Sequence, residues 1–277
     1  MSRVYVIAEI GINHNGSIDL AKSLIRQASL SGADAVKFQK RTIDLVYTDA
    51  ELDRFRDSPW GTTNRQQKEG LEFSMEQYKE LEEFTCGLDM DFIVSCWDLN
   101  SVDLVEEHLN IRYHKVASAL TTDKSFLEKL NATGRPVILS TGMCTSEQID
   151  AAIEILDNVE IVLACTSTYP TVPSEVNLRH INTLKQKHPG LKVGFSNHYS
   201  GLDACVGAVA VGAQCVEFHI THDRTSYGSD QSASIENSDS LVNGIRNMEL
   251  MLGDGIKRVY DSEVPIAKKL RKNDDIL

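Results

Sequence analysis

The sequence predicts a TIM (β/α)8 barrel, an α/β fold in which eight parallel strands alternate with eight helices. Eight short runs rich in β-branched residues alternate with amphipathic stretches along the 277 residues. Strands that alternate with helices of about 10–15 residues are typical of βαβ units and a parallel sheet. The runs recur about every 30 residues, the size of one βαβ step, and eight such steps close a barrel.

Each predicted strand is a short, mostly apolar run that ends near polar residues. The predicted strands are Val4–Ala8, Ala35–Phe38, Phe92–Ser95, Tyr113–Ala117, Val137–Ser140, Ile161–Ala164, Lys192–Phe195 and Cys215–Phe218. The predicted helices are Leu20–Ser29, Met75–Phe84, Val102–His108, Ser125–Leu130, Ser146–Leu156, Leu178–Lys187, Leu202–Val211 and Ser238–Met251. A doubly wound open sheet is the less favoured alternative, because Gly11–Gly16 lacks the G-x-G-x-x-G spacing of a dinucleotide-binding turn.

The domain organisation follows from these elements. Residues 1–255 form one catalytic barrel domain, and residues 256–277 are interpreted as a terminal helix or a solvated tail. A long loop over about residues 40–74 separates the second strand from its helix. Loops beyond about 12–15 residues are usually functional. This one is predicted either to act as a lid or to be a surface insertion or oligomer contact.

Composition excludes several classes of protein. Hydrophobic residues make up 42% and charged residues 25%, as in ordinary globular proteins. No apolar run approaches the roughly 20 residues of a membrane span, so a membrane protein is not expected. The net charge of −12 argues against nucleic-acid binding. Six scattered cysteines without a C-x-x-C pair, and no secretory signal, predict buried thiols in a cytoplasmic enzyme.

Two lysines in predicted strands indicate an anion site. Barrel enzymes carry their chemistry at the C-terminal ends of the strands, where Lys37 and Lys115 stand. A buried, unpaired lysine is costly, so each needs an anionic partner. With hydroxyls from Ser118, Ser140 and Ser196, the pair suits a phosphate and a carboxylate. The alternative is that each lysine pairs with a local Glu or Asp.

Two histidines indicate a metal site. His198 and His219 end adjacent predicted strands, so their imidazoles can converge on one ion and leave positions for water and substrate. His14 follows the first strand and either lines the same mouth or belongs to a turn before the first helix. Asp230 either reaches a substrate hydroxyl or the ion, or serves only in a turn.

Seven short motifs occur in order near the predicted strand ends. They are AEIGINHNG (8–16), VKFQ (36–39), HKVAS (114–118), LSTGM (139–143), CTSTYPT (165–171), GFSNH (194–198) and VEFH (216–219). With Asp230, these motifs resemble the sialic acid (N-acetylneuraminate) synthase family over nearly the whole chain. That family condenses phosphoenolpyruvate with an N-acylated hexosamine, usually N-acetylmannosamine, to give a nonulosonic acid and phosphate.

The resemblance implies a role for each site residue. His198 and His219 would hold a divalent ion, usually Mn²⁺ with Mg²⁺ or Co²⁺ as alternatives. Glu9 would orient or activate water, and Tyr169 and Asp230 would face the sugar. Asp230 joins Glu9, Lys37 and Lys115 in the expected catalytic set. Phosphoenolpyruvate and the aldose would be bound by Lys37, Gln39, Lys115, Ser118, Ser140, Ser167 and Ser196.

The chain also departs from the family pattern. It is expected to be a short form without the C-terminal antifreeze-like domain, which in the family takes part in a domain-swapped dimer; a homodimer here would rely on barrel contacts. Leu120 stands where a carboxylate is usual, Ser167 where Asn is usual, and Asn197 where Asp is usual. Two alternatives stay open: a Schiff-base aldolase using Lys37 or Lys115, and a catalytically silent barrel that binds a sugar acid.

Overall fold

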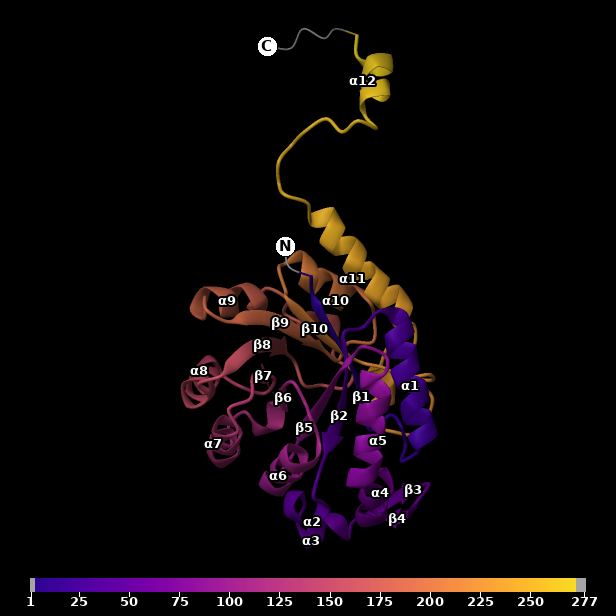
Figure 1. The fold of residues 1–277 in the computed structure, drawn as a ribbon, viewed down its shortest axis with the longest axis vertical. Coiled ribbons are helices and arrows are strands. Elements are labelled where there is room, and N and C mark those ends of the chain that lie inside the picture. Colours follow the sequence, from indigo (N-terminus) through magenta and orange to yellow (C-terminus); the bar gives the residue numbers. More distant parts are fainter. Residues whose placement is uncertain (1–2, 273–277) are drawn as a thin grey trace.

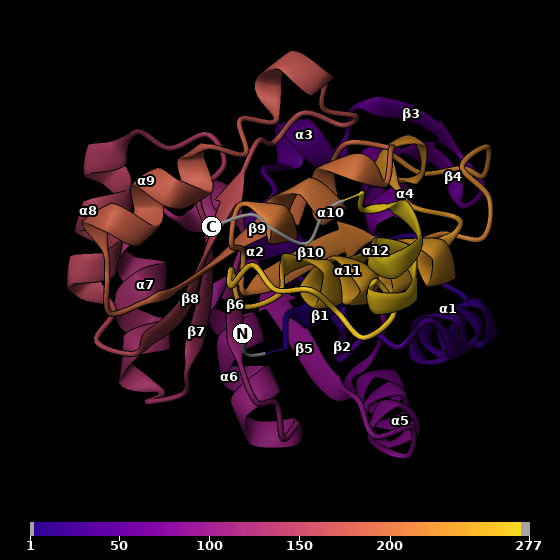
Figure 2. The ribbon, with the colours of Figure 1, turned by 90° about the horizontal axis from the view of Figure 1, so that it is seen from above.

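A closed barrel of eight parallel strands lies at the centre of the chain, in a computed structural model that describes residues 3–272 (Figures 1 and 2). The strands follow one another around the barrel in the order β1, β2, β5, β6, β7, β8, β9 and β10, and β10 closes on β1. The predicted TIM barrel is confirmed, and each predicted strand end is correct to within three residues. The strands are β1 Tyr5–Gly11, β2 Ala35–Lys40, β5 Asp91–Cys96, β6 His114–Val116, β7 Val137–Ser140, β8 Val159–Cys165, β9 Lys192–Asn197 and β10 Cys215–His219.

The helices that follow these strands surround the barrel (Figure 2). Five of the eight start with a side-chain cap. Ser17 accepts a hydrogen bond from the Leu20 N–H at the start of the first helix, and Thr145 and Gln148 form a capping box. Gly32, with φ of 82°, ends the first helix. The helices are α1 Ile18–Ser31, α5 Met75–Cys86, α6 Leu99–His108, α7 Lys124–Ala132, α8 Ser146–Ile155, α9 His180–Lys187, α10 Asp203–Ala210 and α11 Ser238–Leu252.

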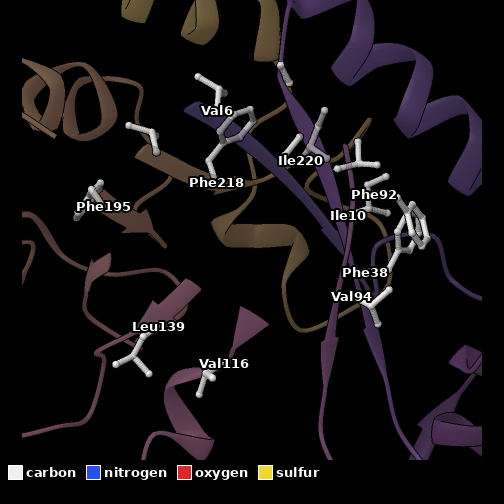
Figure 3. Close-up of a cluster of buried hydrophobic side chains, with 14 of the residues drawn as sticks. Val6, Ile10, Phe38, Phe92, Val94, Val116, Leu139, Phe195, Phe218 and Ile220 are labelled. Atoms are coloured by element: carbon white, nitrogen blue, oxygen red, sulfur yellow. The ribbon is translucent and has the colours of Figure 1, made fainter. Parts of the chain in front are cut away.

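The main hydrophobic core lies between the outer face of the barrel and these helices. Alternate strand residues such as Val6, Phe38 and Phe218 point outward and are fully buried (Figure 3). Phe38 and Phe92 pack with ring centroids 5.4 Å apart. Burying each such side chain contributes about 1.5–3 kcal/mol, so this layer supplies most of the force that holds helices on the barrel.

The inward-facing side chains change character halfway along the strands. A lower layer is apolar and includes Ile7, Ile93 and Leu163, which close the barrel floor. Two residues further along each strand, the same inward face becomes polar. The members of this upper layer are Glu9, Lys37, Ser95, Lys115, Ser140, Cys165, Ser196 and Glu217. The period of two in a strand therefore places a polar floor beneath the barrel mouth.

The segment predicted as a long loop is folded. Residues 41–74 contain the helices α2 Ile43–Val46, α3 Asp49–Leu52 and α4 Asn64–Leu71 and the hairpin strands β3 Phe55–Ser58 and β4 Gly61–Thr63. Capping boxes at Thr48 and Thr63 start two of the helices. The prediction of a loop was wrong because elements of three or four residues are too short to show a periodic pattern. Short 3-10 turns cover Ser118–Leu120, Pro173–Glu175 and Gln231–Ala233.

This insertion leans against the segment that follows β10. The Trp60 ring meets the Tyr227 ring edge to face at a centroid distance of 5.8 Å, and the Tyr227 hydroxyl donates to the Asp57 carbonyl oxygen at 3.4 Å. At the other end of the chain, residues 253–263 lead away from the barrel to α12 Val264–Leu270 (Figure 1). In the described part of the chain, none of the helices has the length and apolar character needed to span a membrane.

Gly194 in β9 tests how tightly the barrel interior is packed. A Cβ atom there would lie 2.4 Å from the Cys215 carbonyl oxygen and 2.7 Å from Leu163 Cδ2. We expect Gly194→Ala to lower the free energy of unfolding by about 1–3 kcal/mol in urea denaturation, because backbone must move to admit the methyl group. Gly190→Ala is the matched control, since no atom lies within 4 Å of its Cβ position. Equal stability of the two variants would contradict this packing.

Candidate active site

A cavity with an empty volume of about 690 Å³, its open mouth included, lies at the C-terminal ends of the barrel strands. The sequence-predicted site residues that line it are Glu9, Lys37, Gln39, Lys115, Ser118, Ser140, Ser167, Tyr169, Ser196, His198 and His219. Asp230 is at the edge, with Oδ2 at 3.6 Å from His219 Nδ1. The structure therefore brings together all twelve residues, from the strands β1, β2, β6, β7, β9 and β10 and from the segments that follow β6, β8, β9 and β10.

The floor of the cavity is a network of four buried charges. Lys37 Nζ lies 2.6 Å from Glu9 Oε2 and 3.8 Å from Glu217 Oε1. Lys115 Nζ lies 3.3 Å from the same Glu217 oxygen. None of these side chains is more than 4% exposed, and their formal charges cancel. Both lysines thus have carboxylate partners in the free protein, as the alternative interpretation of the sequence proposed.

The pKa values of the two lysines in this network shift in opposite directions. Burial opposes the charged form of Lys37, but the Glu217 and Glu9 carboxylates outweigh it and raise the pKa of Lys37. Burial lowers the pKa of Lys115, which is 3.3 Å from one carboxylate and is repelled by Lys37. Although burial alone would raise it, the pKa of Glu217 is lowered by Lys115 and Lys37. Lys37 is therefore a fixed positive charge, whereas Lys115 gives up a proton more readily.

Hydroxyl groups surround a small space beside Lys115. The Gly142 N–H donates to Ser118 Oγ at 3.0 Å. A Cβ atom at residue 142 would lie 2.1 Å from Ser167 Oγ and 2.8 Å from Ser118 Oγ, so only glycine leaves this space open. Ser140 Oγ is buried and has no hydrogen-bond partner among the described residues. Donors beside an ammonium group are suited to a phosphate or carboxylate.

The two histidines face each other across the opposite side of the cavity. Their ring centroids are 5.2 Å apart, and the Tyr169 ring lies 4.0 Å from that of His198. His198 Nδ1 donates to the Thr166 carbonyl oxygen at 2.7 Å, which leaves the Nε2 lone pair free. His219 Nδ1 is buried without a hydrogen-bond partner within residues 3–272.

This donor set fits a divalent metal held in an open site. A backbone carbonyl that fixes the tautomer of one imidazole is the usual support of a metal-binding histidine. No cluster of three or more His, Cys, Asp or Glu side chains suited to a metal occurs in the described part of the chain. The remaining ligands would therefore come from water and substrate, as catalytic sites require.

The predicted site omits six lining residues, of which Glu217, Ser95 and Trp97 carry polar groups in their side chains. Glu217 connects both lysines and accepts a hydrogen bond from Ser196 Oγ at 3.2 Å. Ser95 and Trp97 line the cavity from the end of β5. The signal for Glu217 was present, because it stands two residues before His219 on one strand and so faces the same side.

His14 lies outside the main cavity. Its Nδ1 accepts a hydrogen bond from the Gly16 N–H at 3.0 Å, and its ring stacks on Phe73 at a centroid distance of 4.1 Å. Burial lowers its pKa to about 3, so it is neutral at physiological pH. Of the two interpretations from the sequence, the turn before α1 is therefore the one observed.

Comparison with known proteins identifies consistent relatives. The model of the NeuB family matches residues 24–257. A mouse protein named N-acetylneuraminate-9-phosphate synthase is 39% identical over 276 residues, which cover 97% of this chain and 77% of the relative. An N,N'-diacetyllegionaminic acid synthase from Legionella pneumophila is 35% identical over 282 residues, which cover 97% of this chain and 79% of the relative.

Solved structures agree with this result. A sialic acid synthetase from Leptospira borgpetersenii, solved with citrate, superimposes with a TM-score of 0.84 at 28% identity and covers 98% of this chain and 94% of its own. A truncated 3-deoxy-D-arabino-heptulosonate 7-phosphate synthase from Thermotoga maritima, at 14% identity and a TM-score of 0.65, covers 90% of this chain and 86% of its own. The latter likeness supports the barrel fold alone.

We expect Glu217 and Lys115 of the buried network to be energetically coupled. Glu217→Gln leaves Lys115 without its carboxylate, and we expect the free energy of unfolding to fall by about 3–5 kcal/mol in urea denaturation. Adding Lys115→Met to Glu217→Gln removes the unpaired charge and should recover about 1 kcal/mol or more. If Glu217→Gln and Lys115→Met lower the free energy of unfolding additively, the two side chains are not energetically coupled.

Proposed function

The chain belongs to the NeuB family, and we propose that it joins phosphoenolpyruvate to an N-acylated hexosamine or related aldose. The products would be a nonulosonic acid, which is a sialic-acid-like sugar acid, and inorganic phosphate. The curated relatives support this assignment, since they are named as synthases of N-acetylneuraminate 9-phosphate and of N,N'-diacetyllegionaminic acid. The observation that carries the proposal is the pairing of two buried lysines with free hydroxyl donors on one side of the cavity and two histidines on the other.

Phosphoenolpyruvate would bind over the lysine network. An ammonium group has three donors, and the carboxylates of Glu9 and Glu217 do not use all of them. The remaining donors, with Ser118, Ser140 and Ser167, suit the phosphate and carboxylate oxygens of this substrate. Because the free network is neutral, the hydroxyls and the Gly142 cradle would have to supply the extra stabilisation that an incoming anion needs.

The reaction would then develop negative charge on the aldehyde oxygen and positive charge at C2 of phosphoenolpyruvate. Carbon C3 of phosphoenolpyruvate attacks the aldehyde carbon, forming the new C–C bond and an alkoxide, while positive charge develops at C2. Glu9, held by Lys37 at 2.6 Å and by Gln39 Nε2 at 2.6 Å, would stabilise that charge and take a proton from the water that adds to C2. The C2–O bond to phosphate would break as the new C2 hydroxyl gives its proton to the departing phosphate, and the proton taken up by Glu9 would neutralise the alkoxide, which yields the keto acid and phosphate.

The other residues would orient the aldose. His198 and His219 would hold a divalent ion, with Mn²⁺ the first choice and Mg²⁺ or Co²⁺ as alternatives. When bound, such an ion polarises an aldehyde and stabilises negative charge on its oxygen. Tyr169, stacked on His198, and Asp230, at 3.6 Å from His219, would contact the sugar beside them.

One observation favours a second candidate, a Schiff-base aldolase. Burial lowers the pKa of Lys115, which is the property of a nucleophilic lysine. Borohydride reduction in the presence of pyruvate would trap a covalent adduct on Lys115 if this chemistry operated. The condensation proposed above involves no such adduct, so mass spectrometry of the treated protein separates the two reactions.

The proposed reaction predicts phosphate release that depends on an aldose. With phosphoenolpyruvate and Mn²⁺, we expect release with at least one of N-acetylmannosamine, its 6-phosphate, mannose or a 2,4-diacetamido-2,4,6-trideoxyhexose, and loss of release with EDTA. Lys115→Met should lower kcat/KM by about 100-fold or more, because a buried anion loses its charged partner. Lys185→Met on the exposed face of α9 is the control. Stabilisation by phosphoenolpyruvate without turnover of any aldose would instead favour the silent barrel.

The metal proposal has a test independent of turnover. We expect the dialysed protein to bind about one Mn²⁺ per chain in isothermal titration calorimetry. His198→Gln or His219→Gln should weaken this binding by about 100-fold or more, because each removes a ligand. His222→Gln serves as control, since that imidazole hydrogen-bonds Ser23 on the outer surface. Unchanged affinity in both ligand variants would overturn the assignment.

A further inference from the structure

A second, smaller cavity adjoins the active-site cavity and has no role in the chemistry described so far. It lies between the start of α1, the end of β2 and the insertion, and Gln39 lines both cavities. Gln39 Nε2 donates to Glu9 Oε1 at 2.6 Å, and Gln39 Oε1 accepts from Arg41 Nη2 at 2.5 Å. One amide thus separates the reacting centre from the second cavity. The lining residues are Ile12, His14, Gln39, Arg41, Ile43, Lys68, Leu71 and Glu72.

Two cations in this second cavity have no carboxylate partner among the described residues. Arg41 donates to the neutral Gln39 amide and lies 4.2 Å over the Trp97 ring, and its Nε is buried without a partner. Lys68 forms no salt bridge within residues 3–272, and its Nζ lies 5.0 Å from the centroid of the Tyr47 ring. The acidic lining residue, Glu72, is already paired with Lys40 at 2.6 Å.

The cations also disfavour each other. Burial, together with the nearby charges of Arg41 and Arg56, lowers the pKa of Lys68 to about 8. Two half-buried, mutually repelling cations without a carboxylate in contact are destabilising in the free protein. A dianion placed between them would satisfy both groups, because a guanidinium offers a fork of donors and an ammonium offers three.

We propose that this second cavity binds a phosphate group carried by the acceptor sugar, at the end of the sugar remote from its aldehyde. The inference rests on the proposed function, since it assumes that the aldehyde lies at the histidine pair. Asp230 Oδ2 is 3.6 Å from His219 Nδ1, and a Cβ atom at Gly11 would lie 3.5 Å from this oxygen and 3.1 Å from Gln39 Nε2. Gln39, which lines both cavities, therefore stands between the histidine pair and the second cavity. A sugar that extends from the histidines past Gln39 therefore directs its far end toward Arg41 and Lys68.

This assignment implies a function for the insertion over residues 41–74. Arg41 follows directly from β2, whereas Lys68 comes from α4 within the insertion. The Trp60 indole packs over Gly70 of the same helix, where a Cβ atom would lie 2.1 Å from the indole, and meets Tyr227 on the other side of the mouth. The insertion would thus hold Lys68 in place and select the acceptor by its charge.

Matched kinetics with two acceptors test the proposal. For the wild-type protein, we expect kcat/KM with N-acetylmannosamine 6-phosphate to exceed that with N-acetylmannosamine by about 10-fold or more. Arg41→Gln and Lys68→Gln should each reduce this ratio by about 10-fold, which corresponds to the loss of one contact worth about 1.4 kcal/mol. Arg65→Gln is the control, because Arg65 is on the same helix but pairs with Asp44 at 2.5 Å. Glucuronic acid, a sugar carboxylate, tests whether any remote anion suffices.

The possible results distinguish failure of the phosphate site from failure of the proposed synthase function. Turnover of N-acetylmannosamine with a ratio near one, or equal ratios in all variants, would overturn the phosphate site and leave the synthase function intact. Turnover of neither acceptor would count against the proposed function with these sugars. Isothermal titration calorimetry with phosphoenolpyruvate and EDTA present then tests the phosphate site without turnover. The site is supported if N-acetylmannosamine 6-phosphate binds more tightly than N-acetylmannosamine, and if Arg41→Gln and Lys68→Gln weaken this binding but Arg65→Gln does not. Binding that none of these substitutions weakens, or no binding, overturns it.

Discussion

The ion pairs that join Lys37 and Lys115 to Glu9 and Glu217 are the constraint on which the polar half of the barrel depends. Closing eight strands forces their alternate side chains into one dry interior, where a single unpaired charge is destabilising by several kcal/mol. Two lysines can stay there only because two carboxylates on neighbouring strands neutralise them. The apolar layer below, with Ile7 and Ile93, keeps water from reaching these pairs from the barrel floor.

Most of the fold and much of the site could be predicted because both follow from periodic patterns. The strands and helices of the barrel repeat often enough for their type to be recognised, and the C-terminal end of each strand then identifies the residues that meet at the mouth. The insertion over residues 41–74 shows the limit of this approach. Its helices α2 and α3 have four residues each, and only α3 has a side-chain cap. The insertion also relies on contacts such as Trp60 with Tyr227, which form only in the folded barrel.

The partners of the charged groups could not be predicted for a related reason. A lysine at a strand end indicates that an anion is near, but Glu9, Glu217 and a substrate all satisfy that requirement. Only the closed barrel decides among them: the register places Glu9 beside Lys37 on β1 and β2, whereas Lys115 on β6 meets Glu217 on β10 across the barrel interior. His14 is a similar case, since its motif suits either a turn or a site until the position of Phe73 is known.

The register also separates the two lysines, which look equivalent in the sequence. Lys37 lies between two carboxylates, at 2.6 and 3.8 Å, and so keeps its proton. Lys115 is in contact with one carboxylate at 3.3 Å and is repelled by the charge of Lys37, so its pKa falls while that of Lys37 rises. A group with a permanent charge is suited to binding an anion throughout a reaction, whereas a group with a lowered pKa can give a proton to a leaving phosphate. In the proposed reaction, the asymmetry in carboxylate contacts would let both lysines bind the anion while only Lys115 also gives up a proton.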